Sequence, residues 1–173
     1  CLYEAAARAG VKKVVYSSSL YAYGRRNVPA MVETECPQPD TVYGMSKLAG
    51  EHLARWLMNK HGIPFNILRY FFIYGPRQYA SSGYQSLIPK TFSRILKGES
   101  PLICGDGRQV LDYLYVEDAV AATIQALETD ISGEVFNVGS GVGVSVEEMV
   151  QKMLAVAGST ALPVYVAPDN TAG

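Results

Sequence analysis

The chain has 173 residues, 49% of them hydrophobic and 18% charged, so it can bury a core and is not a disordered tail. Its 15 basic and 16 acidic side chains give a net charge of −1, which argues against nucleic acid or a membrane surface as a partner. The longest apolar run is far shorter than the ~18 residues of a membrane helix, so we expect no membrane span. Cys1, Cys36 and Cys104 are odd in number, widely spaced and outside any metal-ligand pattern, which favours a reducing, cytoplasmic setting.

Helical and strand patterns alternate along the chain, which predicts an α/β fold. The β-branched run at residues 14–16 predicts a buried parallel strand, and the polar segment 18–40 predicts a long loop. A helix follows that Asp40 or Thr41 can cap and that ends near His61. Its apolar stripe consists of Ala49, Leu53, Trp56 and Leu57.

The second part of the chain continues the alternation with shorter elements. We expect strands over residues 63–71, 101–104, 112–115 and 134–138. Helices are expected over residues 88–96 and 116–129, and a last helix begins at a capping box formed by Ser145 and Glu148. This order predicts the C-terminal half of an open sheet with a small appended lobe.

Tyr43 and Lys47 stand four residues apart on the helix expected after residue 40, and therefore on one face. The run Ser17-Ser18-Ser19 ends the strand before it, and ligands of parallel sheets lie beyond the carboxyl ends of the strands. A phenol is a weak base at neutral pH, but a nearby ammonium stabilises the phenolate. A serine beside them can hold the oxygen whose proton leaves. The trio suits proton removal from a secondary alcohol while a cofactor takes the hydride.

Three longer motifs resemble the extended short-chain dehydrogenase/reductase superfamily, and within it the NAD-dependent epimerase/dehydratase family. They are Ser17-Ser18-Ser19-Leu20-Tyr21-Ala22-Tyr23-Gly24, Tyr43-Gly44-Met45-Ser46-Lys47 and Arg69-Tyr70-Phe71 followed by Tyr74-Gly75-Pro76-Arg77-Gln78. Gly105-Asp106-Gly107, Asp112-Tyr113 with Glu117-Asp118, and Phe136-Asn137-Val138-Gly139 fit the same family. The sequence is most similar to nucleotide-sugar epimerases of the UDP-glucose 4-epimerase type.

The resemblance implies a Rossmann dinucleotide-binding domain with NAD, a substrate-binding lobe, a nucleotide-sugar substrate (a UDP-hexose) and a homodimer. Residues 1–75 would form the C-terminal half of the Rossmann domain, and residues 76–173 mainly the lobe with interleaved Rossmann elements. The implied catalytic residues are Ser19, Tyr43 and Lys47. The implied cofactor contacts are Ser17, Ser18, Tyr43, Lys47, Tyr70 and Phe71. The implied substrate contacts are Ser19, Phe72, Ser86, Leu87 and Arg108.

Two positions after Ser19 bear on the type of reaction. Dehydratases of the family carry an Asp-Glu pair there, and decarboxylases carry a glutamate two residues before the tyrosine of the Tyr-Gly pair. This chain has Leu20 and Tyr21, which cannot replace a carboxylate in those steps. The sequence therefore favours 4-epimerisation, with simple dehydrogenation of a sugar or another alcohol as the alternative.

Two departures from the family pattern concern the nucleotide. The asparagine that usually follows Arg-Tyr-Phe is Phe72, and the arginine that usually precedes Asp112 is Leu111. Both replacements remove polar contacts to a charged group. Asp112, Glu117 and Asp118 do not indicate a metal site, because the last two are expected to begin a helix, where negative charge is favoured.

No glycine-rich phosphate turn follows the first strand, where a Rossmann fingerprint would stand. The glycines of residues 139–143 have the spacing G-x-G-x-G and would fall in the lobe, so we interpret them as unrelated to the dinucleotide. We therefore expect a C-terminal fragment of a longer family member with an incomplete cofactor site. An inactive, oligomerising fragment is the alternative that is not an enzyme.

Overall fold

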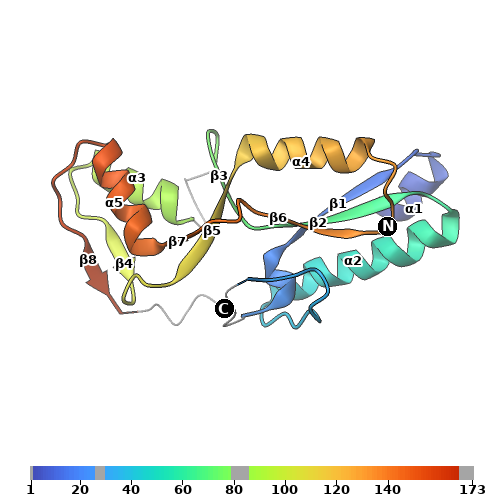
Figure 1. Ribbon diagram of the computed structural model, residues 1–173, viewed down its shortest axis with the longest axis horizontal. Coiled ribbons are helices and arrows are strands. Elements are labelled where there is room, and N and C mark those ends of the chain that lie inside the picture. The colour runs from blue at the N-terminus through green and yellow to red at the C-terminus, as the bar shows by residue number, and fades with distance from the viewer. Residues whose placement is uncertain (1, 26–29, 79–85, 168–173) are drawn as a thin grey trace. The chain divides into compact units, whose positions relative to one another are not determined.

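The computed structural model describes residues 2–25, 30–78 and 86–167, and the chain divides into two compact units (Figure 1). Unit 1 consists of Cys1–Ile73 and Leu114–Gly139, and unit 2 consists of Tyr74–Tyr113 and Ser140–Gly173. Both units are therefore discontinuous in sequence.

Unit 1 contains a parallel three-stranded sheet in the order β1-β2-β6, which confirms the predicted α/β class. The strands are β1 (Val14–Ser19), β2 (Phe65–Tyr70) and β6 (Val135–Val138). Every residue of the central strand β2 is buried, as expected for a parallel strand covered on both faces. Ser19 stands opposite Tyr70, and Tyr70 opposite Val138, so the three strands end together at one edge.

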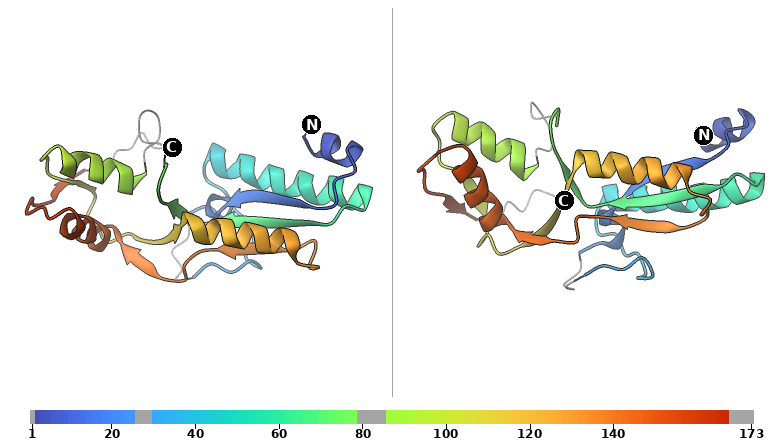
Figure 2. Two further views of the ribbon diagram at one scale, coloured as in Figure 1. Left: turned by 90° about the horizontal axis from the view of Figure 1, so that it is seen from above. Right: turned by 45° about the horizontal axis from the view of Figure 1, so that its top comes forward.

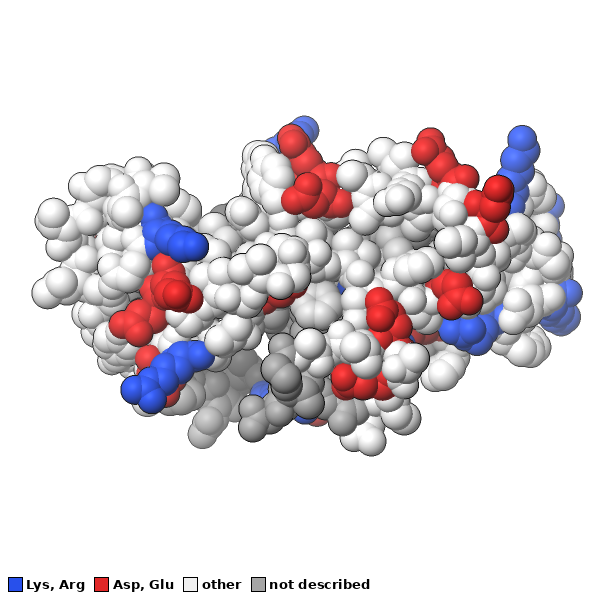
Figure 3. All heavy atoms as spheres, in the orientation of Figure 1, with Lys and Arg blue, Asp and Glu red and all other residues white. Residues whose placement is uncertain are grey.

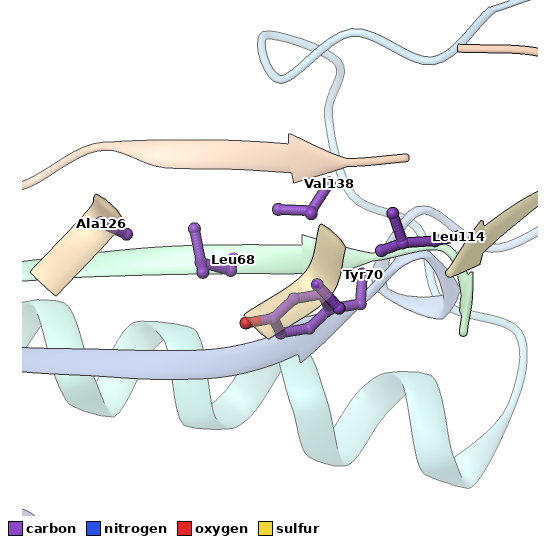
Figure 4. Packing of buried hydrophobic residues seen from close by; sticks show 6 residues of the cluster. Leu68, Tyr70, Leu114, Ala126 and Val138 are labelled. Carbon is purple, nitrogen blue, oxygen red and sulfur yellow. The ribbon is translucent and has the colours of Figure 1, made fainter. Parts of the chain in front are cut away.

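Two helices cover opposite faces of this sheet: α2 (Val42–His61) and α4 (Val116–Glu128) (Figures 1 and 2). On the α4 side, side chains from β2, β6 and α4 form one apolar cluster that includes Leu68, Tyr70 and Val138 (Figure 4). On the α2 side, Met58 packs with Phe65 and Ile67. Each such side chain contributes roughly 1.5–3 kcal/mol by leaving water. The short helix α1 (Leu2–Arg8) packs against α2.

The termini of α2 are as the sequence predicts. Thr41 is the N-cap, with its hydroxyl accepting the Gly44 N–H at 3.0 Å, and Gly62 ends the helix in the left-handed conformation. Of the predicted apolar stripe, only Leu57 is buried against the sheet, whereas Ala49, Leu53 and Trp56 are exposed. The face toward the sheet instead consists of Gly44, Glu51, Ala54, Leu57 and Met58.

The segment after β1 also differs from the predicted loop. The strand continues to Ser19, and a 3-10 helix, η1 (Leu20–Tyr23), follows directly. Ala22 and Tyr23 are completely buried, which explains why the chain turns inward here instead of forming an exposed loop.

Unit 2 is built from two helices and short strands. The helices are α3 (Leu87–Leu96) and α5 (Val146–Val156), and the strands are β4 (Leu102–Cys104), β7 (Gly143–Ser145) and β8 (Val164–Val166). The chain passes from unit 1 to unit 2 within strand β3 (Phe72–Tyr74). It returns to unit 1 within strand β5 (Val110–Tyr115), which pairs antiparallel with β7. β4 and β8 are parallel.

The core of unit 2 lies between α3, β4 and α5, where Ile95, Ile103 and Val150 are buried together. The predicted capping box of α5 is confirmed: the Ser145 hydroxyl accepts the Glu148 N–H, and the Glu148 carboxylate accepts the Ser145 N–H.

Basic and acidic side chains are interspersed on the face shown in Figure 3. Among the described residues, no helix is long and apolar enough to cross a bilayer.

Candidate active site

A cavity of about 420 Å³ opens in unit 1 beyond the carboxyl ends of β1 and β2. Its polar wall carries hydroxyl and ammonium groups, and its other wall is largely apolar. The lining residues are Ser17, Ser18, Ser19, Tyr43, Lys47, Tyr70, Phe71, Ile73, Val116, Ala119, Val120 and Thr123. All residues predicted as catalytic or cofactor contacts thus line one cavity, although their roles stay predictions.

Tyr43 and Lys47 reach this cavity from the first two turns of α2. Tyr43 is 52% exposed, so its hydroxyl-bearing ring is accessible to a ligand. The Lys47 ammonium donates to the Ser17 carbonyl oxygen at 2.9 Å and lies 5.6 Å from the centroid of the Tyr43 ring. It is also 5.8 Å from the ring of Tyr16, whose hydroxyl donates to the Lys47 carbonyl. These contacts fix Lys47 beside Tyr43.

Ser19 is the last residue of β1 and the N-cap of η1. Its Oγ accepts the backbone N–H of Tyr21 at 3.3 Å, and the residue is only 7% exposed. A serine hydroxyl has one proton to donate besides its acceptor lone pairs. Because the Tyr21 amide occupies an acceptor position, the Ser19 hydroxyl keeps its own proton available for donation.

A buried ionic network lies directly behind the cavity. Arg69 of β2 forms a two-point pair with Glu51 of α2, at 2.9 Å from Nε to Oε1 and 2.6 Å from Nη2 to Oε2. Ser18 of β1 donates its hydroxyl to Glu51 as well. Burial by itself lowers the pKa of Arg69, but the hydrogen bonds and charge of Glu51 outweigh it, so this pKa is raised. Arg69 therefore stays charged, and its contacts with Glu51, together with that of Ser18, tie α2 to two strands.

The network continues through an aromatic residue to the far strand. The Arg69 guanidinium lies 4.5 Å from the centroid of the Tyr23 ring, a cation–π contact. The Tyr23 hydroxyl donates to Asn137 Oδ1 at 2.7 Å, and the Asn137 N–H donates to Glu33 Oε1 at 2.8 Å. All three strands of the sheet are thus linked at the edge where the cavity opens.

Helix α4 provides a part of the cavity wall that was not predicted from the sequence. Val116, Ala119 and Val120 supply an apolar surface, and the Thr123 hydroxyl is hydrogen-bonded to that of Tyr70. The only signal in the sequence was that the helix predicted over residues 116–129 has an apolar side. An apolar side does not show whether a helix lines a cavity or packs in a core.

The substrate contacts predicted outside the trio do not line this cavity. Phe72 packs edge-on against Tyr21, with ring centroids 6.3 Å apart. In unit 2, Ser86 precedes α3 and accepts a hydrogen bond from Gln78 at 2.9 Å, while Leu87 packs on the core of that unit. The Arg108 side chain is 86% exposed, 4.0 Å from Asp106. Their roles toward a substrate remain predictions.

The glycine-rich turn after β6 is occupied by a carboxylate of unit 2. Asp112 Oδ1 accepts the Ser140 N–H and hydroxyl, both at 2.7 Å, and Oδ2 accepts the Gly141 N–H at 2.9 Å. These amides are engaged by a negative charge, which excludes them as a phosphate cradle. Leu111, next to Asp112, packs on the unit 2 core. Within the described ranges, no group of three or more His, Cys, Asp and Glu residues could hold a metal ion.

A parallel sheet with helices on both faces and a polar cavity beyond its carboxyl edge defines a Rossmann-type nucleotide-binding fold. The family model "NAD dependent epimerase/dehydratase family" matches residues 1–139, and the chain belongs to this family. This confirms the resemblance inferred from the motifs and establishes NAD as the cofactor of the family.

Several curated relatives share about a third of their residues with this chain. A putative UDP-glucose 4-epimerase of Methanocaldococcus jannaschii is 36% identical over 140 residues, 80% of this chain and 45% of the relative. A UDP-N-acetyl-alpha-D-glucosaminuronate decarboxylase of Bacillus cytotoxicus is 34% identical over 171 residues, 93% of this chain and 51% of the relative. The chain thus spans about half the length of the curated relatives it matches.

Solved structures agree with this assignment. The UDP-N-acetylglucosamine 4-epimerase of Methanobrevibacter ruminantium, in complex with UDP-N-acetylmuramic acid, aligns with a TM-score of 0.92 at 33% identity, over 98% of this chain and 54% of its own. The UDP-glucuronic acid 4-epimerase of Bacillus cereus, in complex with UDP-glucuronic acid and NAD, aligns with a TM-score of 0.88 at 32% identity. The alignment covers 96% of this chain and 52% of that structure's chain.

The donors around the cavity fit the nicotinamide end of NAD. Tyr43 and Lys47 present a hydroxyl and an ammonium suited to ribose hydroxyls. Phe71, Ile73 and Val120 provide an apolar surface suited to a flat heterocycle. The described residues of the cavity include no cradle of backbone amides for the pyrophosphate.

Proposed function

We propose that this chain supplies the base, the substrate-orienting serine and the nicotinamide side of the cofactor site of a nucleotide-sugar 4-epimerase. Tyr43 takes the proton of the sugar 4-hydroxyl, and Ser19 donates a hydrogen bond to that oxygen. Lys47 stabilises the phenolate of Tyr43. When bound, NAD supplies the hydride acceptor and donor. The 4-keto sugar turns over, Tyr43 returns the proton, and no net oxidation results.

The observation that carries this proposal is the pair of residues directly after Ser19. Leu20 and Tyr21 begin η1 beside Tyr43, and neither can act as a carboxylic acid or carboxylate. Dehydration and decarboxylation both need such a group at this place, by the resemblance described above. The relatives include dehydratases and a decarboxylase, so this local difference supports epimerisation against them.

The two units suggest a division of the work. Unit 1 holds the cavity, and we propose that it carries the reacting groups and the nicotinamide. Unit 2 would form the substrate lobe and contact the nucleotide sugar through Ser86, Leu87 and Arg108. In the structure, unit 1 ends at Ile73 and resumes over Leu114–Gly139.

The test is a product analysis with the native polypeptide that contains this chain. It is incubated with NAD and, in turn, UDP-glucose, UDP-N-acetylglucosamine and UDP-glucuronic acid, and the sugars are identified by NMR. We expect at least one of these to yield its 4-epimer without net NADH. A 4-keto-6-deoxy sugar or a pentose product would overturn the proposal.

A related dehydrogenase or reductase is the second candidate, because the nucleotide contacts depart from the family pattern. Phe72 is packed against Tyr21, and Leu111 is packed into the unit 2 core, so neither offers a polar contact. In that case the same assays would accumulate NADH in proportion to an oxidised sugar or alcohol.

We also propose that the protein is a homodimer that uses α2. Val42, Met45, Leu53 and Trp56 expose large apolar side chains along this helix, with Trp56 61% exposed. Such a row is costly in water and is normally covered by a partner. The family resemblance supports a second copy as that partner.

A further inference from the structure

We propose that Tyr21 is a positioning residue that couples Ser19 to Tyr43. This inference rests on the proposed function, because it concerns the geometry between the substrate-orienting serine and the base. Ser19 comes from β1 and Tyr43 from α2, so no single element fixes their distance. Tyr21 contacts both.

The contact to Ser19 is made by the backbone of Tyr21. Its N–H donates to Ser19 Oγ at 3.3 Å, and this bond orients the hydroxyl that would meet the substrate. The Tyr21 carbonyl in turn accepts the Gly24 N–H at 3.2 Å, which closes the turn of η1. The main chain of Tyr21 is therefore held in place independently of its ring.

The contact to Tyr43 is made by the side chain. The two rings meet edge to face, with centroids 5.7 Å apart and planes at 81°. Phe72 packs on Tyr21 in the same manner, at 6.3 Å and 71°, and supports it. The Lys47 ammonium lies 5.6 Å from the Tyr43 ring centroid. The half-exposed ring of Tyr43 is thus fixed by two neighbours, Tyr21 and Lys47.

The close approach of η1 to α2 depends on Gly44, the residue after Tyr43. A Cβ placed on Gly44 would stand 2.3 Å from the Tyr21 carbonyl oxygen and 3.0 Å from Pro39 Cβ. Only a glycine lets the first turn of α2 come this near. Tyr21 and Tyr43 are therefore held together by both their rings and their backbones.

A positioning role has a kinetic signature that a merely structural role lacks. A base displaced by about 1 Å can slow the chemical step by ~10²-fold, whereas binding of the nucleotide portion is unaffected. We therefore expect Tyr21→Leu, which removes the ring and keeps the backbone bond, to lower kcat by about 10- to 100-fold. KM should change less than threefold. Tyr21→Phe keeps the ring and should stay within about threefold of wild type.

The decisive test is a double-mutant cycle with Tyr43→Phe, made in the native polypeptide that contains this chain. If Tyr21 acts through Tyr43, adding Tyr21→Leu to Tyr43→Phe slows the residual rate less than twofold. Tyr74→Leu is the matched control, because Tyr74 loses a similar edge contact, 6.5 Å to Tyr113, away from the cavity. It should leave kcat within twofold. Tyr21→Met provides the same comparison if Tyr21→Leu does not fold.

The outcomes separate this inference from the proposed function. The positioning role is overturned if Tyr21→Leu keeps full turnover. It is also overturned if Tyr21→Leu slows the Tyr43→Phe variant by the same factor as it slows the wild type. Either result leaves the assignment of Tyr43 as the base intact. Near-normal turnover by Tyr43→Phe overturns the proposed function, and the positioning role with it.

Discussion

Glu51 and Arg69 form a two-point ion pair between α2 and the central strand, with side chains only 5% and 4% exposed. Glu51 stands one helical turn after Lys47, and Arg69 directly precedes Tyr70. The pair therefore holds both elements immediately behind the residues that line the cavity. A charge at this depth is tolerated only with its partner.

Removing one member of this pair should strongly destabilise unit 1. Glu51→Leu leaves the Arg69 charge buried and unpaired, so we expect the free energy of unfolding to fall by about 3–5 kcal/mol. The double variant Glu51→Leu with Arg69→Met removes both charges and should recover a large part of that loss. Urea denaturation followed by circular dichroism measures both. Equal stabilities of the single and double variants would contradict the role of the pair.

Tyr43→Phe should abolish most turnover and leave the fold unchanged. The substitution removes only the hydroxyl, at a half-exposed position whose ring contacts do not need it. General acid–base catalysis is typically worth ~10² to 10⁴ in rate, so the native polypeptide should lose at least a hundredfold. The readout is the initial rate of epimerisation, beside an unchanged thermal midpoint. Turnover within about tenfold of wild type would refute the assignment.

The capping box of α5 predicts a pH dependence of stability. Hydrogen bonds from the Ser145 amide and hydroxyl lower the pKa of Glu148 below its ordinary value of 4.5. Because the folded pKa is below the unfolded one, this contribution to stability is present above pH 4.5 and is lost as the pH falls through the folded value. Glu148→Gln should be less stable than wild type at pH 7, and the difference should shrink at pH 3. Thermal midpoints at the two pH values decide it.

The 173-residue chain by itself should not bind NAD with micromolar affinity. Dinucleotide pyrophosphates are held by amides of a glycine-rich turn at a helix N-terminus, and the sequence contains no G-x-G-x-x-G. The turn at Gly139–Gly143 has its Ser140 and Gly141 amides bound to Asp112. Calorimetric titration of the purified chain is the measurement. Stoichiometric micromolar binding would reveal a phosphate site among residues we have interpreted otherwise.

Placing a charge on the exposed face of α2 should break the proposed dimer. Trp56 and Leu53 are exposed on this helix, and a glutamate at either position could not be buried against a second copy. Sedimentation of the wild type at micromolar concentration should give a dimer, and Trp56→Glu should give a monomer with an unchanged circular dichroism spectrum. Lys60→Glu, which places a negative charge beside the Trp56 ring without removing that ring, is the control for charge alone. A monomeric wild type would contradict the proposal.

The sequence predicted those parts of the site that depend on local patterns. Short apolar runs indicated the parallel strands, and the Tyr43 to Lys47 spacing placed both side chains on one helix face. The buried role of Glu51 could not be predicted, because a glutamate on a helix usually faces water and its partner Arg69 lies on a separate element. Which side of α2 faces the sheet could not be predicted, because this helix carries apolar side chains on both sides: Leu57 and Met58 are buried, and Leu53 and Trp56 are exposed.

The wall formed by α4 was out of reach for a related reason. Val116, Ala119 and Thr123 meet Tyr70 only because the chain returns to unit 1 after forty residues of unit 2. No local sequence pattern predicts that the chain returns to unit 1. The family motifs predicted the groups proposed to react, on Ser19, Tyr43 and Lys47. The structure adds the apolar surface of α4 that lines the same cavity.

The return of Leu114–Gly139 to unit 1 also constrains the order in which the protein can assemble during synthesis. Until these residues leave the ribosome, β2 lacks its neighbour β6 and the α4 face of the sheet is bare, with Leu68 and Tyr70 in water. A nascent chain that ends before residue 114 therefore presents an apolar sheet face to chaperones. The cavity acquires its second wall only when translation has passed α4, so the site is completed after both of the strands that carry its polar wall have been made.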